Sequence, residues 1–266
     1  MDPAGLSAVD LALAALAAVA AGAVNALAGG GTLITFPTLT ALGLPAVAAN
    51  VTNTLAVAPG ALGGLLAQRR ELAGQGKRLA RLAPTAFVGG LAGGWLLLHT
   101  DEALFRRLVP WLILAASALL AVQEPLRAWL VARLSGHSLL ADSEAGGAHG
   151  DAVSMALVFA AAVYGGYFGA GLGVIVLAAL GLSLHDSLTR LNATKQAIGL
   201  AANVAAAGLF AVSGPVHWRA ALVMAVGAIA GGALGGHLAG RVRASTLRRV
   251  VVSVGLLAGL VYLARG

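Results

Sequence analysis

The 266-residue chain is 59% hydrophobic and only 10% charged, whereas a typical soluble domain carries about 25% charged residues, so its composition excludes a soluble fold. It contains no cysteine, which excludes disulfides, thiolate metal sites and cysteine nucleophiles. The net charge of +7 is spread over the segments between apolar runs, which is typical of orientation signals and not of nucleic-acid binding.

The apolar runs are about 20 residues long, the length of a helix that crosses a hydrocarbon core about 30 Å thick. A β-barrel would show short alternating segments instead. The sequence therefore predicts an all-α polytopic membrane protein. Near its start the chain carries Asp2 and Asp10 and no basic residue, unlike a secretory signal, so residues 7–28 are expected to be retained.

The first half is expected to begin with a broken helical hairpin. Residues 6–44 are too long for one simple span, and they contain Gly29-Gly30-Gly31 and Pro37, which break or kink a helix. We expect two shorter helical pieces folded back on each other. The elements expected next are spans at 46–68 (interrupted at Pro59-Gly60), 82–99 and 108–122, and a short amphipathic piece with Arg127 and Arg133.

The second half is expected to repeat this order. Residues 152–182 are again broken by small residues, at Gly165-Gly166 and from Gly169 to Gly173. Spans are expected at about 188–212, 217–240 and 246–264. The predicted organisation is a first transmembrane repeat at 1–134, a hydrophilic linker at 135–151 and a second transmembrane repeat at 152–266.

One stretch that occurs twice, at an offset of 142 residues, carries the repeat. Each copy has a glycine cluster within an apolar run, followed by an Asn-x-Thr motif that enters the next apolar run. The aligned identities are Ala28 with Ala170, Gly29 with Gly171, Gly31 with Gly173, Asn50 with Asn192 and Thr52 with Thr194.

The basic residues follow different spans in the two halves. After the Asn-x-Thr span the first half has five basic residues, whereas the second half has the segment Ser213 to Arg219. After the following span the bias reverses, because the first half has Asp101-Glu102 and the second half has four arginines between 241 and 249. Since basic loops lie in the cytoplasm, the halves are predicted to insert in opposite orientations, with about eight transmembrane segments in two inverted repeats, a common transporter plan. Arg106 and Arg107 fall on the predicted outer side and do not fit this assignment.

The glycine breaks are the first candidate site. A broken backbone persists in hydrocarbon only where it is buried in protein or lines a wet cavity. Such a break places N–H groups and the positive end of a short helix near mid-membrane, where an anion could bind. The alternative is that the glycines only permit tight packing. The candidate ligands are Gly29, Gly30 and Gly31 in the first copy and Gly171 and Gly173 in the second, with Asn25 before the first break as either a cap or a ligand.

Polar side chains at the start of the next span complete the candidate site. Lys195 is one of only two lysines, and it leads into a run without another charge, from Ala197 to Val212. A charge within a span is costly and normally marks a pathway or a counter-ion. The alternative is an interfacial lysine whose amine reaches the lipid headgroups. The candidate polar ligands are Asn50, Thr52 and Asn53 in the first half and Asn192, Thr194, Lys195 and Gln196 in the second.

The remaining polar residues carry weaker signals. Asp186 could bind a coupling proton or simply pair with Arg190, so these two residues are the candidates for coupling. The histidines near the predicted span ends lack the spacing of a metal site. No Ser/His or paired-carboxylate pattern stands out, so we expect no catalytic residue, no metal and no cofactor.

The first copy of the repeated stretch resembles the sulfite exporter TauE/SafE family of bacterial permeases. The resemblance lies in the run from Asn25 through Pro37 to Leu39, in Gly43-Leu44-Pro45 and in Ala49 to Thr54. The second copy, from Gly165 to Lys195, is similar to that family's second half, although Ala179 stands where a proline is common and Leu172 interrupts what is often a full glycine run. The resemblance implies a protein of the bacterial inner membrane that moves small sulfur-containing or organic anions, such as sulfite, sulfonates or sulfoacetate. By position it implies a ligand role for the glycines and for the Asn and Thr residues of both motifs.

The sequence as a whole predicts a permease that binds an anion between two inverted halves and alternates its access. The expected partners are a small anionic substrate (sulfite, sulfonate or carboxylate) and the lipid bilayer, with no nucleic acid and with a homodimer left open. One alternative is a passive anion channel, which would show no substrate counterflow. The other is a membrane scaffold without a solute path, whose breaks would be packed solid.

Overall fold

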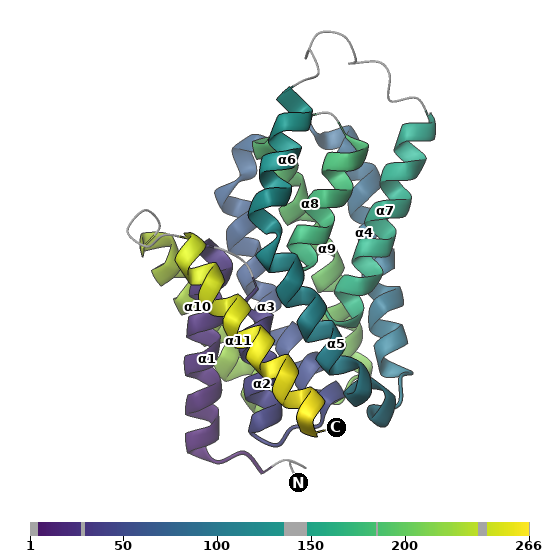
Figure 1. Ribbon diagram of the computed structural model, residues 1–266. Helices are drawn as coiled ribbons and strands as arrows, with labels where there is room; N and C mark the ends of the chain where they lie inside the picture. Colours follow the sequence, from purple (N-terminus) through teal and green to yellow (C-terminus); the bar gives the residue numbers. More distant parts are fainter. Residues whose placement is uncertain (1–4, 28–29, 136–147, 185, 239–243, 266) are drawn as a thin grey trace.

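The computed structural model describes residues 5–27, 30–135, 148–184, 186–238 and 244–265, and within these ranges its regular structure is entirely helical (Figure 1). The elements are α1 (Ala8–Leu27), α2 (Thr32–Ala41), α3 (Ala46–Ala67), a 3-10 turn η1 (Arg69–Leu72), α4 (Gly76–Leu98), α5 (Glu102–Ala121), α6 (Gln123–Ser135), α7 (Ala148–Tyr167), α8 (Leu172–Ser183), α9 (Leu188–Ser213), α10 (Trp218–Leu238) and α11 (Ala244–Arg265).

Six of the described helices contain stretches that are long and apolar enough to cross a membrane. They are Ala8–Asn25, Gly76–Leu98, Glu102–Ala121, Leu188–Ser213, Trp218–Gly235 and Ser245–Ala264. Shorter apolar helices lie at Thr32–Ala41, Asp151–Tyr167 and Leu172–Ser183. The predicted all-α polytopic membrane protein is thereby confirmed.

The first predicted break separates α1 from α2. α1 ends at Leu27 and α2 begins at Thr32, so the long apolar region does form two helical pieces. Gly30 has a φ of +94°, a backbone conformation that other residues rarely adopt. Pro37, which was also expected to break or kink a helix, lies inside α2.

The second break separates α7, which ends at Tyr167, from α8, which begins at Leu172. Gly169 and Gly171 both have positive φ, at +78° and +76°. The Tyr164 hydroxyl donates a hydrogen bond to the carbonyl of Ala170 (2.6 Å), which satisfies part of the broken backbone. Both halves therefore open with a glycine-broken pair of helices.

The structure differs from the sequence expectation at three helix positions. α3 runs without interruption through Pro59, as prolines can in membrane helices where neighbouring groups compensate for the lost hydrogen bond. α4 begins at Gly76 and not near residue 82, so part of the basic segment is helical. α5 begins at Glu102 and not near residue 108, because Asp101 caps it by accepting from Ala103 N (3.1 Å).

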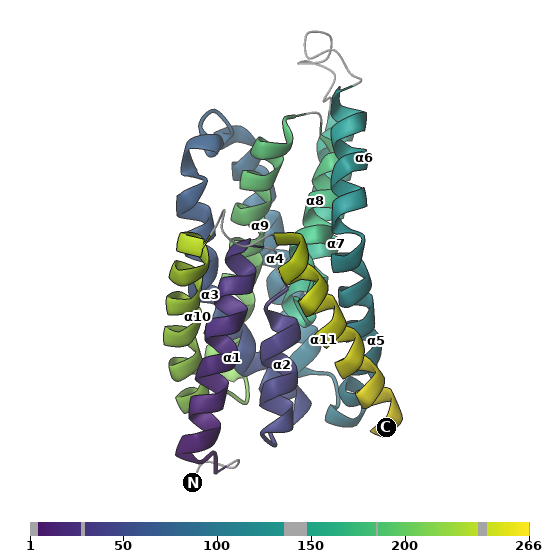
Figure 2. The same ribbon diagram turned by 60° about the vertical axis from the view of Figure 1, so that its left-hand side comes forward.

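The order of helices recurs in the second half at the same offset of 142 residues. α3, α4 and α5 begin at Ala46, Gly76 and Glu102, and their counterparts α9, α10 and α11 begin at Leu188, Trp218 and Ala244. The packing also recurs, because α1 packs on α10 and its counterpart α7 packs on α4, the counterpart of α10. Figure 2 shows α1 beside α10 and α2 beside α11.

The two central counterparts, α3 and α9, lie antiparallel. Near the start of α3, Val51 lies beside Gly214, which follows the end of α9. At the other end, Gln68, which follows α3, accepts a hydrogen bond from Asn192 in the first turns of α9 (2.9 Å). An antiparallel relation between equivalent helices is the arrangement that an inverted repeat requires.

Close helix contacts rely on glycine at equivalent interfaces. A methyl group on Gly231 of α10 would overlap the carbonyl of Val19 in α1. A methyl group on Gly166 of α7 would overlap the carbonyl of Gly90 in α4. Small residues let helix backbones approach each other in lipid, so these glycines act in packing.

Candidate functional site

Both glycine breaks rest against the last turns of α5. A methyl group on Gly30 would lie 2.5 Å from Leu120 Cδ1, and the positive φ of Gly30 also favours glycine at this position. Gly171 of the second break lies beside Ala116 and Leu119, which a methyl group would meet at 3.6 to 3.7 Å. The fold therefore brings the two breaks, which lie far apart in the chain, to neighbouring turns of one helix.

An aromatic cluster holds the second break in place. Phe168 packs edge-on against Phe36 of α2, with ring centroids 5.4 Å apart, and against Phe105 of α5, with centroids 6.4 Å apart. All three rings are buried, with exposed fractions of 2% or less. Residues of the second half are thus fixed against helices of the first half, which makes this break an interface between the two.

Asn25, near the end of α1, forms a hydrogen bond across the first break. Its Oδ1 accepts a hydrogen bond from Gly31 N (2.8 Å), and the Thr35 hydroxyl donates to the Gly31 carbonyl (3.2 Å). Of the two roles expected for Asn25, this geometry is that of a cap. Gly29, another predicted ligand, lies outside the described residues.

The first Asn-x-Thr motif is buried and contacts the second half. Asn50 Nδ2 donates to the Tyr167 carbonyl at the end of α7 (2.8 Å), and Thr52 Oγ1 accepts from His217 N (3.0 Å). The Oδ1 atoms of Asn50 and Asn53 are buried and have no hydrogen-bond partner among the described residues. Buried polar atoms are normally paired, so this unused capacity is where water or a polar ligand would bind.

The second Asn-x-Thr motif contacts the first half in an equivalent way. Thr194 is fully buried, and its hydroxyl donates to Gln75 Oε1 (2.8 Å). Thr52 and Thr194 are equivalent at the offset of 142, and so are His217 and Gln75, so each threonine contacts the equivalent position of the other half. The bonds differ, because Thr52 Oγ1 accepts from the backbone of His217 whereas the Thr194 hydroxyl donates to the side chain of Gln75.

The structure does not gather the two motifs into one site. They lie toward opposite ends of α3, because Asn50 is in its first turns while Asn192 contacts Gln68 beyond its last. At a rise of 1.5 Å per residue, about 27 Å of chain axis separates position 50 from position 68. The predicted ligands therefore belong to two places.

Lys195 lies against the first turn of α8. A methyl group on Gly173 would be 3.8 Å from Lys195 Cδ, so the alkyl chain of the lysine passes over this glycine. Lys195 is partly buried, as is the neighbouring Gln196. No carboxylate among the described residues pairs with Lys195, and the charge that acts on it is the like charge of Arg127 on α6.

Two predicted site residues, one from each half, contact the segment around the second break. Asn50 of α3 binds it at Tyr167, and Lys195 of α9 covers it at Gly173. Gly171, which directly precedes α8, has no side chain to cap the first turn, and the positive end of that helix lies in the same region. A cation beside a helix N-terminus is a setting suited to an anion.

Asp186 and Arg190 form an ion-pair network at the starts of α4 and α9. Asp186 pairs with Arg78 (2.7 Å) and with Arg190 (3.1 Å), and its Oδ1 accepts from Ser187 N (2.7 Å). Burial raises the pKa of Asp186, but the hydrogen bonds from Arg78, Ser187 and Arg190 outweigh this effect, so the pKa lies below its ordinary value. Proton uptake by this carboxylate would first require these bonds to break.

The sequence did not point to Gln75 or Gln68, and it placed Arg127 on a short amphipathic piece without a role in the site. Gln75 is 3% exposed, and besides accepting from Thr194 it accepts from Arg78 (2.7 Å) and donates to the Glu71 carbonyl (2.8 Å). The sequence feature that could have identified Gln75 is its equivalence to His217 in the repeat. Among the described residues, no group of three His, Asp or Glu side chains could hold a metal ion.

Comparison with known proteins agrees with this architecture. A model of the family described as "Sulfite exporter TauE/SafE" matches residues 14–262. The chain is 30% identical over 242 residues to a "Probable membrane transporter protein" of Haemophilus influenzae, covering 90% of this chain and 89% of the relative. It is 26% identical to the "Probable membrane transporter protein YfcA" of Escherichia coli K12, covering 83% and 77% of the two chains.

A third relative is the "Probable membrane transporter protein ORF9" of a Sinorhizobium species, 24% identical over 92% of this chain and 89% of the relative. No solved structure matches. The helices that can cross a membrane, together with these relatives, make the chain a multi-pass protein of a bacterial membrane. The family match spans nearly the whole chain, and the protein belongs to the sulfite exporter TauE/SafE family.

Proposed function

We propose that this protein is a secondary transporter that carries small anions across the bacterial inner membrane by alternating access. The observation that carries the proposal is the second glycine break, which both halves reach through Asn50 at Tyr167 and Lys195 at Gly173. A site shared between two halves changes its access when one half moves against the other.

The charge of the site favours an anion. Lys195 lies in a membrane helix without a paired carboxylate among the described residues. A charge in such a helix is costly, and a bound anion would offset it. The positive end of α8 at Gly171 adds to this attraction.

The buried amides provide orientation. The Oδ1 atoms of Asn50 and Asn53 accept hydrogen bonds from none of the described residues. Such acceptors suit a water molecule or the hydroxyl of a protonated oxyanion, so a hydrogen sulfite ion fits this set of groups. The proposed substrate is therefore sulfite or a related organosulfur or organic anion, in keeping with the family's description.

Alternating access follows from the repeat. The contacts Thr52–His217 and Thr194–Gln75 each tie one Asn-x-Thr span to a helix of the other half. We infer that transport weakens one set of these contacts while the other set is kept, and that the second break opens toward each side in turn. Asp186 and Arg190 remain candidates for coupling in this scheme.

The test is counterflow of labelled sulfite in proteoliposomes. Vesicles preloaded with unlabelled sulfite should accumulate label transiently and saturably, and sulfate, acetate and an alkyl sulfonate added outside should rank by affinity. Lys195→Ala should lose this exchange, whereas Lys77→Ala, which changes an exposed residue at the start of α4, should keep it. Uptake without counterflow would indicate a channel, and the absence of any flux from folded protein would leave a scaffold role.

A further inference from the structure

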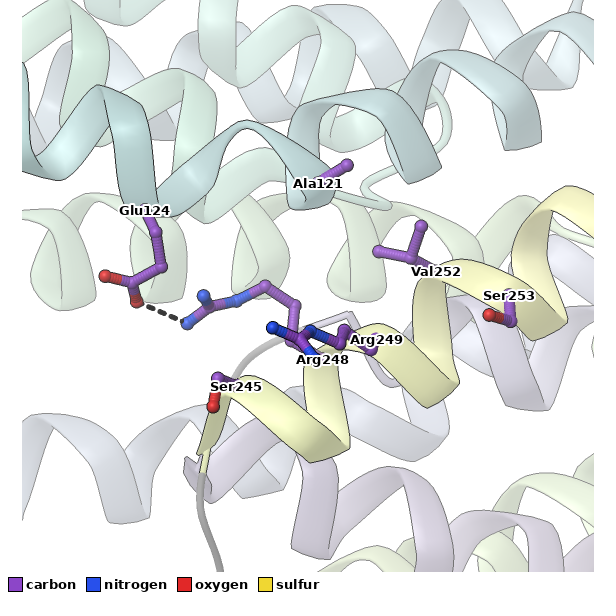
Figure 3. A pocket seen from close by; sticks show the side chains of 7 residues that line it. All are labelled: Ala121, Glu124, Ser245, Arg248, Arg249, Val252 and Ser253. Atoms are coloured by element: carbon purple, nitrogen blue, oxygen red, sulfur yellow. Dashed lines mark ion pairs between the residues drawn. The ribbon is translucent and has the colours of Figure 1, made fainter.

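A charged pocket lies where the junction of α5 and α6 meets the start of α11 (Figure 3). Its volume is about 460 Å³, many times the share of about 30 Å³ that one water occupies in the liquid. It therefore has room for a small ion with part of its hydration shell. It is lined by Ala121, Glu124, Ser245, Arg248, Arg249, Val252 and Ser253.

Arg248 is an unusual arginine because it is buried in the first turns of a membrane helix. Its exposed fraction is 8%, and its Nη2 forms an ion pair with Glu124 Oε1 (2.8 Å). Its Nε is buried and donates to no acceptor among the described residues. Figure 3 shows the guanidinium extending from α11 across the pocket toward Glu124.

The pocket carries more positive than negative charge. Among the described residues that line the pocket, Glu124 is the one carboxylate, against the guanidinium groups of Arg248 and Arg249. Ser245 and Ser253 add hydroxyl groups that can donate to an oxygen atom. Ser245 also lies in the first turn of α11, where the helix dipole favours a negative charge.

The ion pair between the Glu124 carboxylate and Arg248 is weak. The side chain of Glu124 is 53% exposed, whereas that of Arg248 is 9% exposed. Ion pairs with an exposed partner contribute little stability, so an incoming anion can replace Glu124 at small cost. Arginine presents a planar set of donors that matches an oxyanion in a bidentate manner, and the unused Nε belongs to that set.

We propose that this pocket binds a small oxyanion of the phosphate or sulfite type, which takes the place of Glu124 on Arg248 and is also held by Arg249 and Ser245. The oxyanion could belong to a free solute or to a lipid headgroup, since both present the same oxygens. The site is distinct from the second break, where Lys195 lies.

The pocket is next to the first glycine break. Gly30 packs against Leu120 and Val251, which directly precede the lining residues Ala121 and Val252 in sequence. An anion that moves the Arg248 side chain or the start of α11 would therefore act on the groups that support Gly30. This position links occupancy of the pocket to the first break.

The chain offers a matched control for Arg248. Arg106 and Arg107 are equivalent to Arg248 and Arg249 at the offset of 142 residues, and they lie in the first turns of α5. Both are exposed and neither lines the pocket. Replacing Arg106 by glutamine removes the same charge from an equivalent helix position without touching the proposed site.

The test measures binding of sulfate and of inorganic phosphate to purified protein by titration calorimetry. It is done in the Lys195→Gln background, so that the proposed transport site does not contribute. Arg248→Gln should weaken binding by about tenfold or more, the effect of one charged hydrogen bond. Glu124→Gln should strengthen binding several-fold, because it removes the internal competitor, and Arg106→Gln should leave it unchanged.

A second arm separates free solute from lipid. The same variants are reconstituted in nanodiscs of phosphatidylcholine with or without phosphatidylglycerol, and protection of the protein against heat is recorded. If soluble anions protect the variants in the predicted order, the site binds a free solute. If that order is seen only in nanodiscs with phosphatidylglycerol, the site binds a lipid headgroup.

Two results would overturn the proposal. One is binding by Arg248→Gln equal to that of the parent with every probe, and the other is no gain in Glu124→Gln. If Arg248→Gln does not fold, Arg249→Gln replaces it, because Arg249 is exposed and its loss leaves the Glu124 ion pair intact. Sulfite counterflow with intact Lys195 is scored separately, so failure of the pocket and failure of the transport proposal are distinguishable.

Discussion

Replacing the charge of Lys195 should impair anion binding without harming the fold. The perturbation is Lys195→Gln, which keeps much of the side chain's length over Gly173 but removes the ammonium group. Because no described carboxylate pairs with Lys195, the substitution leaves no partner without its charge. The proposed anion alone should lose an interaction.

The size of the effect follows from the charge that is removed. A hydrogen bond to a charged group contributes about 1.5–3 kcal/mol, and each 1.4 kcal/mol corresponds to about a factor of ten in affinity. The half-saturating anion concentration should therefore rise by about 10- to 150-fold. Thermal stability should stay the same or rise slightly, since a partly buried charge without a partner is costly to the fold.

The assay is sulfite counterflow at several concentrations, with the amount of folded protein in each vesicle preparation measured. Lys195→Arg keeps a cation and should retain more activity than Lys195→Gln, and Lys77→Gln serves as the exposed control. Saturation curves of Lys195→Gln that match the parent would refute the role of this lysine. A large loss of thermal stability in Lys195→Gln would refute the separation of binding from folding.

Four further outcomes are expected. Thr52→Val removes the acceptor of the buried His217 N and should lower the free energy of unfolding by about 1–3 kcal/mol in denaturation experiments, with Thr52→Ser restoring it. Thr194→Val removes one of two donors to Gln75 Oε1, which still accepts from Arg78, so its cost should be smaller, about 0.5–1.5 kcal/mol, with Thr194→Ser restoring it. Gly166→Ala should destabilise by about 1–3 kcal/mol through overlap with the Gly90 carbonyl, whereas Gly208→Ala, where a methyl group meets nothing within 4 Å, should be neutral or stabilising. Gly171→Ala should cost about 1–2 kcal/mol because of its positive φ, and Gly173→Ala, in ordinary contact with Lys195, should be milder. Asp186→Asn should lower the stability of the protein at neutral pH. The pKa of Asp186 in the folded state lies below the ordinary 3.8, so the stability that its carboxylate contributes is full above about pH 4 and is lost as the pH falls through the lowered pKa. Melting curves recorded from pH 3 to pH 7 would show this dependence.

The helix plan could be predicted because composition and local chemistry determine it. Apolar length identified the spans, and the glycine clusters identified the two breaks, since Gly30 and Gly171 adopt positive φ. The residues at which the helices begin and end were harder to predict from the sequence. α5 begins earlier than its apolar run because Asp101 caps it and because Glu102 accepts hydrogen bonds from Ala46 N (2.6 Å) and Val47 N (3.0 Å) of α3. Such a long-range contact is not visible in a local pattern.

The grouping of the site residues was harder to predict than their identity. Sequence symmetry relates Asn50 to Asn192, and it was natural to expect them together. Equivalent residues of antiparallel helices meet only near the symmetry axis, however, and these two lie toward opposite ends of α3. Burial of Arg248 was also beyond the sequence, because it depends on Glu124 and the α5–α6 junction folding over the start of α11.

The repeated contact of each threonine with the other half has an energetic consequence for the alternating access that we propose. If the halves were identical, exchanging their conformations would turn the outward-facing state into the inward-facing one at equal free energy. The resting preference must then come from positions where the halves differ, such as Gln75 against His217, Lys195 against Asn53 and Glu102 against Ala244. A difference of about 1.4 kcal/mol suffices for a tenfold bias, so a single substitution at one of these positions can reverse which side the empty transporter faces.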